Sequence, residues 1–338
     1  MSTFPPKIRR LSEMVHKQEG DCFVMLTQKE RHTTKEGKPY YRLNFCDSQR
    51  DVQCPVWSDS GFFEECEEKY QVGNYYKIRI VYRETSFGPK VELKKIREVV
   101  DGDKNDGFDP YLCRPCSAVA PEILLEELTD LARAHLGKNP LLLLIQRIFK
   151  EYRPKILLAA ASRYHHHAYA GGLLEHTLSV TRIVILLYEH YCRTYPRLKT
   201  QLSKPLLVAG AILHDIGKII EMEYNAVTPL HTTGGELIGH PILGRDLVQK
   251  YAPLVELDPQ IRFQLEHIIL AHPRFTDWGA AKPPMSLEAM IVHHADYSEA
   301  TLSSALHLLD TDDSTGDFTY KKGPFGSPLL QLYKEKKM

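Results

Sequence analysis

The hydrophobic pattern of this 338-residue chain changes its period near residue 100, and this change limits the folds that are open to it. Before residue 100, apolar side chains mostly alternate with polar ones, which is typical of half-buried β-strands. After about residue 118 they recur at helical spacing, for example in 121–136 and 171–191. Because a run of strands followed by a run of helices indicates separate domains, we predict two domains, at residues 1–105 and 106–338.

The first domain reads as five short strands with one helix between the third and the fourth. The helix is expected in 61–70, and the turn-like segment 47–49 separates the second strand from the third. Side chains that share the apolar face of a strand are Tyr41, Leu43 and Phe45, then Val52, Cys54 and Val56, then Tyr76, Ile78, Ile80 and Tyr82, and finally Val91 and Leu93. This order of elements is that of an OB-fold barrel, so we predict an N-terminal all-β OB-fold barrel.

The polar faces of two strands predict a surface for single-stranded nucleic acid. Lys77, Arg79 and Arg83 lie opposite the apolar face of the fourth strand, and Trp57 lies opposite that of the third. Bases stack on aromatic rings and phosphates pair with cations, so interleaved side chains of these two kinds suit single strands of RNA or DNA. A solvated barrel face with incidental aromatic residues is the alternative interpretation.

Composition limits the partners and the compartment. Lys and Arg together number 43, as do Asp and Glu, so no overall charge indicates nucleic acid or membrane, although a local groove can still be basic. The N-terminal residues lack the apolar core of a secretory signal, and the longest apolar runs are too short for a membrane span. Seven cysteines with irregular spacing suit a reducing compartment. We therefore predict a cytoplasmic protein without a membrane partner, and read Cys113 and Cys116 as thiols of the linker between the domains.

Ionisable side chains interrupt the apolar helices of the second domain. The clearest case is 209-AGAILHDIGK-218, where His214 and Asp215 follow an apolar run and Lys218 comes one turn later. Isolated histidines on such faces are usually hydrogen-bonded core residues, but burying several ionisable groups together is costly unless an opposite charge compensates them. A divalent metal ion supplies that charge. The candidate ligands are His176, His214, Asp215, His240, His272 and Asp296.

The ligand types narrow the choice of metal. Imidazole and carboxylate ligands without a thiolate suit Mn, Fe, Zn, Co or Ni better than Mg or Ca. Adjacent residues on a helix point about 100° apart, so His214 and Asp215 can bind one ion from two sides, or Asp215 can bridge two ions. We predict one or two ions. Lys218 shares a face with His214 and is placed to hold a phosphate oxygen, so Lys218 and Asp215 are the predicted catalytic residues.

The order His176, His214–Asp215 and Asp296 resembles the HD superfamily of metal-dependent phosphohydrolases. The resemblance implies that these four residues bind the first metal ion, and that His240 and His272 are candidates for a second ion. With an OB-like domain in front, and with 164-YHHHAYAGGLLEHTLSV-180 and 277-DWGAAKPPMSLEAMIVHHAD-296, nearly the whole chain resembles the YhaM-like 3′–5′ exoribonucleases. The resemblance implies a C-terminal all-α HD domain that uses Mn²⁺ to remove mononucleotides from the 3′ end of single-stranded RNA. It also implies a homo-oligomer.

Three consecutive histidines, His165, His166 and His167, precede the first predicted metal ligand. An imidazole with a pKa near neutrality suits contact with a flanking phosphate or protonation of the leaving oxygen, so all three are candidate substrate-binding residues. Two other functions stay open: an HD phosphohydrolase of small nucleotides with a regulatory OB domain, and a non-enzymatic protein that binds single-stranded nucleic acid. The sequence also leaves open whether the polymer is RNA or DNA, because that choice depends on a contact to the 2′-hydroxyl.

Overall fold

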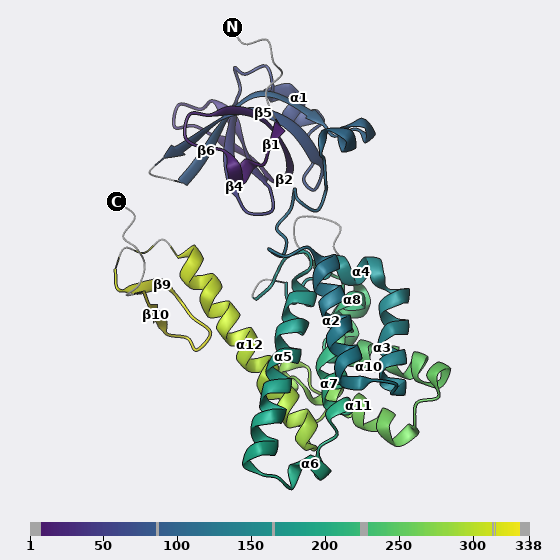
Figure 1. Ribbon diagram of the computed structural model, residues 1–338. Coiled ribbons are helices and arrows are strands. Elements are labelled where there is room, and N and C mark those ends of the chain that lie inside the picture. Colours follow the sequence, from purple (N-terminus) through teal and green to yellow (C-terminus); the bar gives the residue numbers. More distant parts are fainter. Residues whose placement is uncertain are drawn as a thin grey trace. The chain divides into compact units, whose positions relative to one another are not determined.

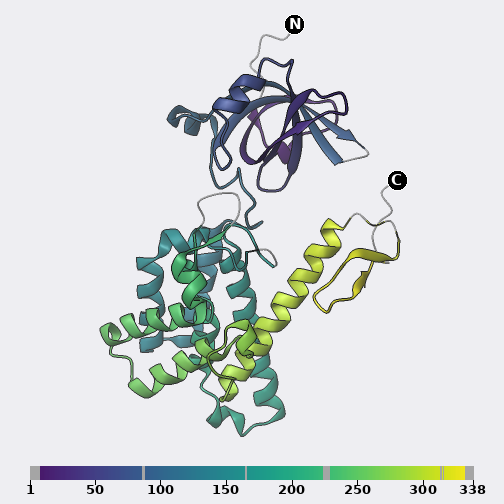
Figure 2. The same cartoon turned by 180° about the vertical axis from the view of Figure 1, so that it is seen from behind.

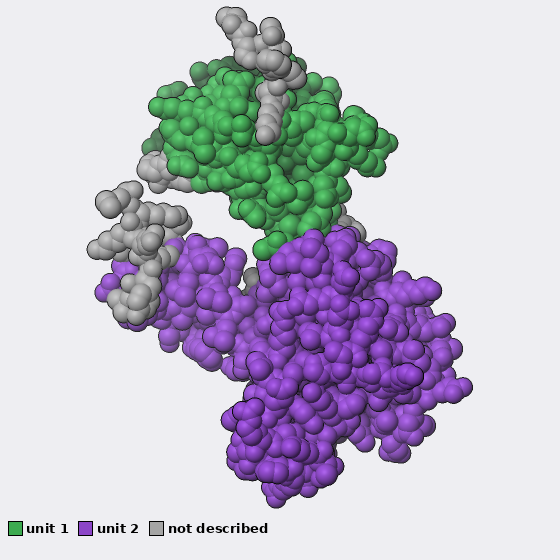
Figure 3. Space-filling model, viewed as in Figure 1, with its two compact units in different colours: residues 1–118, 224–228 green, residues 119–223, 229–338 purple. Residues whose placement is uncertain are grey.

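The structure is a computed structural model that describes residues 8–331, except 86–87, 164–165, 224–228, 313 and 315. The described residues up to Ala118 form one compact unit, and those from Val119 onward form a second (Figure 3). We refer to them as unit 1 and unit 2. The His165 candidate lies outside the described residues.

Unit 1 is a closed β-barrel (Figure 1). β2 pairs with β3, β3 with β4, β4 in parallel with β6, β6 with β5, and β5 back with β2, so five strands form a ring. The elements are β1 (Ile8–Arg9), a 3₁₀ turn (Leu11–Glu13), β2 (Glu19–Thr33), β3 (Pro39–Cys46), β4 (Asp51–Trp57), α1 (Phe63–Glu68), β5 (Tyr75–Thr85) and β6 (Gly88–Glu98). Five barrel strands with a helix between the third and the fourth confirm the predicted OB-fold order.

Strand alternation places the apolar face of each strand inside the barrel. Tyr76, Ile78, Ile80 and Tyr82 on β5 are all at most 2% exposed, as expected from their spacing. The segment after β6, which reads as a linker, instead begins with a 3₁₀ helix (Asp101–Asp106) that packs on the barrel. Two nitrogens of Arg97 hydrogen-bond both carboxylate oxygens of Asp103, at 2.7 and 2.6 Å. A bidentate pair of this kind fixes the segment against β6.

Unit 2 is built from helices, which confirms the predicted helical class. They are α2 (Pro121–Leu136), α3 (Pro140–Glu151), α4 (Arg153–Leu158), α5 (Gly172–Thr194), α6 (Leu198–Gln201), α7 (Lys204–Leu213), α8 (Lys218–Glu221), α9 (Thr233–Ile238), α10 (His240–Tyr251), α11 (Pro259–Ala271) and α12 (Leu287–Thr311), with 3₁₀ turns at Ala252–Val255 and Thr276–Trp278. Two small strand pairs, which the helical pattern did not predict, are β7 (Met222–Glu223) with β8 (Leu230–His231) and β9 (Phe318–Lys322) with β10 (Pro328–Leu330). The β9–β10 hairpin follows the end of α12 in both views (Figures 1 and 2).

The helix α7 lies at the centre of unit 2. All eight residues from Leu206 to Leu213 are buried, and α7 packs against α2, α3, α5, α11 and α12. A helix that is apolar on every face has to be surrounded by other helices. Its C-terminal end therefore delivers His214 and Asp215 into the interior. Within the described ranges, no helix has the combination of length and apolar character that a membrane span requires.

Local sequence signals start the helices that carry the predicted ligands. The side chains of Ser203, Asp258 and Ser286 accept hydrogen bonds from backbone N–H groups in the first turns of α7, α11 and α12. These caps satisfy amide groups that have no partner within the helix. Proline follows directly in the first turn of α7 and α11, where its fixed backbone angle suits a helix start.

Candidate metal centre

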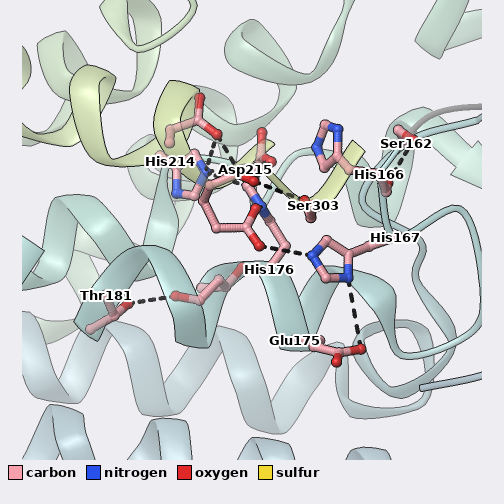
Figure 4. A network of polar contacts seen from close by, with 12 residues as sticks. Ser162, His166, His167, Glu175, His176, Thr181, His214, Asp215 and Ser303 are labelled. Atoms are coloured by element: carbon pink, nitrogen blue, oxygen red, sulfur yellow. Dashed lines mark hydrogen bonds and ion pairs between the residues drawn. The ribbon is translucent and has the colours of Figure 1, made fainter. Parts of the chain in front are cut away.

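Asp215 is the central residue of the candidate site. It is 2% exposed, and its two carboxylate oxygens face different pairs of histidines. Oδ2 lies 3.3 Å from His176 Nε2 and 3.4 Å from His214 Nε2. Oδ1 lies 3.3 Å from His240 Nε2 and 3.4 Å from His272 Nε2. One carboxylate therefore connects two clusters of potential ligands, and Figure 4 shows the first of them.

Asp296 completes the first cluster. Its Oδ1 lies 3.2 Å from His176 Nε2 and 3.8 Å from His214 Nε2. The two imidazole nitrogens are themselves only 3.3 Å apart. His176 comes from α5, His214 follows α7, and Asp296 lies on α12, so three helices meet at this point.

The other ring nitrogen of each histidine has a fixed partner. Nδ1 of His214 and Nδ1 of His272 each lie 2.7 Å from a backbone carbonyl oxygen three residues earlier. Nδ1 of His176 lies 2.5 Å from Glu299 Oε2, and Nδ1 of His240 lies 3.1 Å from Glu221 Oε1. A carbonyl or carboxylate oxygen only accepts, so each Nδ1–H donates, and in the neutral imidazole Nε2 carries the lone pair. Histidines that bind metal ions in proteins are usually oriented in this way.

The two histidines that face Asp215 Oδ1, His240 and His272, give the strongest evidence for a bound cation. Burial lowers the pKa of His272, so its imidazole is neutral and its Nε2 lone pair faces a carboxylate oxygen. Asp215 Oδ1 accepts no hydrogen bond from any described residue, although it is buried. Lone pairs that face one another at 3.3 to 3.4 Å are repulsive unless a cation lies among them. The donor set of buried imidazoles and carboxylates therefore fits a divalent metal ion.

The electrostatics of the site also favour positive charge. Burial opposes a charge on His176, yet hydrogen bonds to Asp215, Asp296 and Glu299 raise its pKa well above the ordinary value. Burial also opposes ionisation of Asp215, but the Lys218 ammonium and the His214 imidazole hold the pKa of this carboxyl well below its ordinary value. The carboxylates are thus ionised in a buried place, where a bound cation is worth most.

Lys218 begins α8, three residues after Asp215. Its Nζ lies 2.5 Å from Asp215 Oδ2. Burial alone would lower the pKa of Lys218, but the Asp215 carboxylate raises it, so the ammonium stays charged. The side chain also lines a pocket of about 200 Å³ beside the clusters. The lining residues are His166, Asp215, Lys218, His240, His272, Pro273, His293, Asp296, Tyr297 and Ala300.

A glycine allows the second cluster to form. A Cβ on Gly217 would lie 2.0 Å from the backbone oxygen of His240 and 2.6 Å from the backbone nitrogen of Gly244. Only hydrogen in place of a side chain lets the start of α8 lie so close to α10. This close approach sets the separation of His240 from Asp215.

The predicted substrate-contacting histidines differ in position. His166 lines the pocket, whereas His167 Nε2 lies 2.8 Å from Glu299 Oε1. His267, five residues before His272, lies outside the clusters, and its Nε2 accepts a hydrogen bond from the Met285 backbone N–H at 2.9 Å. Within the described residues, three sets of side chains have metal-binding spacing: His176, His214 and Asp215; Asp215, His240 and His272; and His167, His176 and Glu299.

The four barrel residues that we predicted to bind nucleic acid are of two kinds: three cations that pair with carboxylates, and one exposed aromatic ring. Lys77 Nζ lies 2.8 Å from Asp106 Oδ2, Arg79 forms a bidentate pair with Asp21, and Arg83 lies 3.2 Å from Glu92. Each of these three cations therefore has a carboxylate partner. Trp57 is 47% exposed.

Trp57 belongs to a ladder of aromatic rings that crosses three strands. His32, Tyr40 and Trp57 are direct neighbours across β2, β3 and β4. The ring centroids of His32 and Tyr40 lie 5.5 Å apart at an interplanar angle of 25°, and those of Tyr40 and Trp57 lie 4.8 Å apart at 34°. Arg42 follows two residues after Tyr40 on the same face of β3, and among the described residues it forms no ion pair.

Three residues near the centre were not predicted from the sequence. Glu299 and Glu221 hold His176 and His240, and buried His293 donates through Nδ1 to the backbone oxygen of His272 at 2.7 Å. His293 and Glu299 each lie three residues from Asp296, and residues at this spacing share a helix face. That spacing is the signal by which they can be found.

Cys113 and Cys116 belong to none of the metal-binding sets that the described residues form. Burial raises the pKa of the Cys113 thiol to about 12, so this sulfur is protonated and unsuited to bind a metal ion. Their interpretation as ordinary thiols is consistent with this environment.

Comparisons with known proteins agree with the predicted HD domain. Residues 173–301 match the model of the HD domain, so unit 2 contains an HD domain. The chain is 26% identical over 299 residues to a protein named 3′-5′ exoribonuclease YhaM from Listeria monocytogenes serotype 4b (strain F2365), and this match covers 87% of the chain and 89% of the relative. Proteins of the same name from Listeria welshimeri and Listeria innocua are 25% and 26% identical, over 87% and 84% of the chain and 89% and 85% of their own lengths.

A solved structure, the second OB-fold domain of replication protein A from Methanococcus maripaludis, matches 27% of the chain and 94% of its own length. The identity is 13% and the TM-score is 0.22. The assignment of the barrel therefore depends on its strand order and closure.

Proposed function

We propose that this chain is a metal-dependent 3′–5′ exonuclease that removes mononucleotides from single-stranded RNA. In this proposal, residues 106–338 form the hydrolase domain and residues 1–105 form a domain that binds the single strand. The seven cysteines are free thiols, which fits our proposal that the protein works in the reducing cytoplasm.

One observation carries the proposal: each oxygen of the buried Asp215 carboxylate faces two histidine Nε2 atoms whose Nδ1 positions are fixed. We propose two divalent ions, Mn²⁺ by preference, with Asp215 as their shared ligand. His176, His214 and Asp296 would hold the first ion, and His240 and His272 the second. Bound there, the ions would supply Lewis-acid stabilisation of the charge on a phosphodiester.

Lys218 would contribute a fixed positive charge. Its ammonium lies on the wall of the pocket and is held by Asp215, so it is placed to pair with a non-bridging phosphate oxygen. A donor that is already oriented stabilises developing negative charge without reorganisation. The relatives named 3′-5′ exoribonuclease YhaM support a polymeric RNA substrate and the direction of degradation.

The aromatic ladder supports a single-stranded substrate. Trp57 is exposed and His32 and Tyr40 are half-buried, so this row of rings on neighbouring strands can accept stacked bases of any sequence, and Arg42 beside it offers a cation to the backbone. We propose that His32, Tyr40 and Trp57 form the stacking surface. Lys77, Arg79 and Arg83 would take part only after giving up their carboxylate partners, so we assign them a smaller share of the binding.

Purified protein incubated with 5′-labelled single-stranded RNA and Mn²⁺ tests the proposal. We expect a ladder of products that shorten from the 3′ end, and we expect no ladder with the His214→Ala/Asp215→Ala double variant. His267→Ala is the matched control, because its imidazole lies outside the clusters and contacts the Met285 backbone.

Two results would contradict the proposal. Hydrolysis of small nucleotides by a protein that leaves RNA intact would favour the small-nucleotide phosphohydrolase. RNA binding without hydrolysis of either substrate would favour the non-enzymatic binding protein.

A further inference from the structure

The loop before α5 places two consecutive histidines in opposite environments. His166 and His167 have ring centroids 6.1 Å apart and ring planes 89° apart, and their imidazoles point in different directions (Figure 4). The sequence alone does not distinguish them. Their surroundings do, provided that the pocket binds a phosphate as in the proposed function.

His167 is bound on both sides of its ring. Nε2 lies 2.8 Å from Glu299 Oε1, and Nδ1 lies 2.8 Å from the Tyr169 hydroxyl oxygen. That hydroxyl donates its single hydrogen to Glu175 Oε2 at 2.8 Å, so the tyrosine oxygen accepts from His167. Both ring nitrogens of His167 are thus committed to donating, and its side chain is only 11% exposed. No nitrogen is left for a substrate.

Glu299 connects this network to the metal centre. It is 7% exposed and uses one carboxylate oxygen for His167 and the other for Nδ1 of His176. A hydrogen bond from Ser303 Oγ to the Glu299 backbone oxygen at 2.8 Å braces this turn of α12. The orientation of a predicted metal ligand therefore depends on a carboxylate that is itself held by His167.

His166 has the opposite character. Its ring lines the pocket together with Asp215 and Lys218, and its centroid lies 5.2 Å from that of His176. Within the described part of the chain no residue hydrogen-bonds this ring. The hydrogen bond from Ser162 Oγ goes to the His166 backbone oxygen instead. The ring therefore keeps an N–H that it can donate to a ligand in the pocket.

The backbone explains why adjacent residues diverge. His167 has a φ of 47°, in the left-handed region that residues other than glycine seldom adopt. Its backbone oxygen accepts a hydrogen bond from the Ala161 backbone N–H at 3.1 Å. The same oxygen lies only 2.1 Å from the position that a Cβ on Gly172 would occupy. The surrounding contacts thus hold a sharp turn that directs one imidazole to Glu299 and the other to the pocket.

We propose that His166 is the histidine of this run that donates a hydrogen bond to the substrate phosphate, and that His167 and Glu299 are positioning residues that orient the metal ligand His176. His166 touches the phosphate beside Lys218. His167 touches no substrate and acts through Glu299.

Four variants separate these roles: His166→Ala, His166→Asn, His167→Ala and Glu299→Gln. His166→Ala should lower kcat for RNA about 100-fold or more, because a donor to the reacting phosphate is lost. Its Mn²⁺ affinity and melting temperature should match the wild type, and added Mn²⁺ should not restore cleavage. His166→Asn, which keeps an N–H donor, should recover at least part of the lost rate.

His167→Ala and Glu299→Gln should instead weaken Mn²⁺ binding by roughly 10- to 100-fold, measured by calorimetric titration. Cleavage by both should return toward the wild-type rate as Mn²⁺ is raised. Equal loss of Mn²⁺ affinity in His166→Ala and Glu299→Gln would overturn the division of roles. So would a His167→Ala protein that binds Mn²⁺ normally but does not cleave RNA at saturating metal.

AMP binding to the Mn²⁺-loaded protein keeps this inference separate from the exonuclease proposal. We expect His166→Ala to weaken AMP binding about 10-fold, and His167→Ala at saturating Mn²⁺ to leave it unchanged. If the wild type binds AMP but does not cleave RNA, the exonuclease proposal is refuted. The AMP affinities of the two variants then decide the roles of His166 and His167. Equal AMP binding by wild type and His166→Ala, or no binding by the wild type, would overturn the role of His166.

Discussion

The substitution Gly217→Ala should separate the two halves of the metal centre. The added Cβ would lie 2.0 Å from the backbone oxygen of His240, and ordinary contacts of a Cβ begin at 3.4 Å. The α10 backbone therefore has to move by about 1.4 Å, because the atoms in contact are backbone atoms and cannot turn aside. His240 Nε2 now lies 3.3 Å from Asp215 Oδ1, so a shift of this size removes it from the second cluster.

The expected effects differ between the two clusters. Overpacking of a tight contact costs about 1–3 kcal/mol, which lowers the melting temperature by about 2–4 °C per kcal/mol in a unit of this size. Calorimetric titration with Mn²⁺ should show a weakened second ion and a retained first ion. A misplacement of about 1 Å can reduce the rate by 100-fold, so RNA cleavage should fall by about that factor.

Gly234→Ala is the matched control for this substitution. Gly234 lies in α9 of the same unit, and its Cβ would meet only Thr232 Oγ1, at 3.8 Å. Replacing glycine by alanine in such a place usually stabilises a protein by about 0.4–1 kcal/mol. If Gly217→Ala bound both ions with wild-type affinity, the argument from the α8–α10 contact would be refuted.

Three further predictions concern the supports of the site and the barrel. Glu221→Gln should weaken the second Mn²⁺ ion about 10- to 100-fold in a calorimetric titration, because Glu221 orients His240; unchanged affinity would show that Glu221 is dispensable. Hydrogen bonds from Arg97 hold the pKa of Asp103 well below its ordinary 3.8, so its contribution to the stability of the barrel is complete above that pH and is lost as pH falls toward the folded pKa. Urea unfolding at pH 6 and pH 3 should show a smaller acid loss for Asp103→Asn than for the wild type, and an equal acid loss would contradict this. Trp57→Ala should weaken binding of an RNA oligonucleotide by about 1–3 kcal/mol per base that it stacks, with little change in salt dependence; a change only in salt dependence would exclude stacking.

The sequence predicts the candidate metal ligands better than it predicts the residues that orient them. His214 and Asp215 are recognisable because they interrupt a helix that is otherwise apolar, and His176 because it lies among leucines. Glu299 and Glu221 look like ordinary helical carboxylates, and only the fold brings them to Nδ1 of a histidine. The spacing of apolar residues along the sequence gives no information about contacts of this kind.

Charge pairing and loop geometry also could not be predicted from the sequence. The period of β5 placed Lys77 and Arg79 on an outer face, but Arg79 has its partner Asp21 58 residues away in the chain. In the same way, three consecutive histidines look alike until the positive φ of His167 turns its ring away from that of His166. The β9–β10 hairpin was missed because a short hairpin beyond a long helix gives too little alternation to detect.

The central claim is that Asp215 is shared by two metal ions, and counting the ions tests it most directly. Protein stripped with EDTA should be titrated with Mn²⁺, comparing wild type, Asp215→Asn and the His267→Ala control. We expect two ions per chain for the wild type and the control, and at most one, bound more weakly, for Asp215→Asn, because an amide offers a single uncharged oxygen. A wild type that binds no ion, or an Asp215→Asn protein that binds two with unchanged affinity, would contradict the claim.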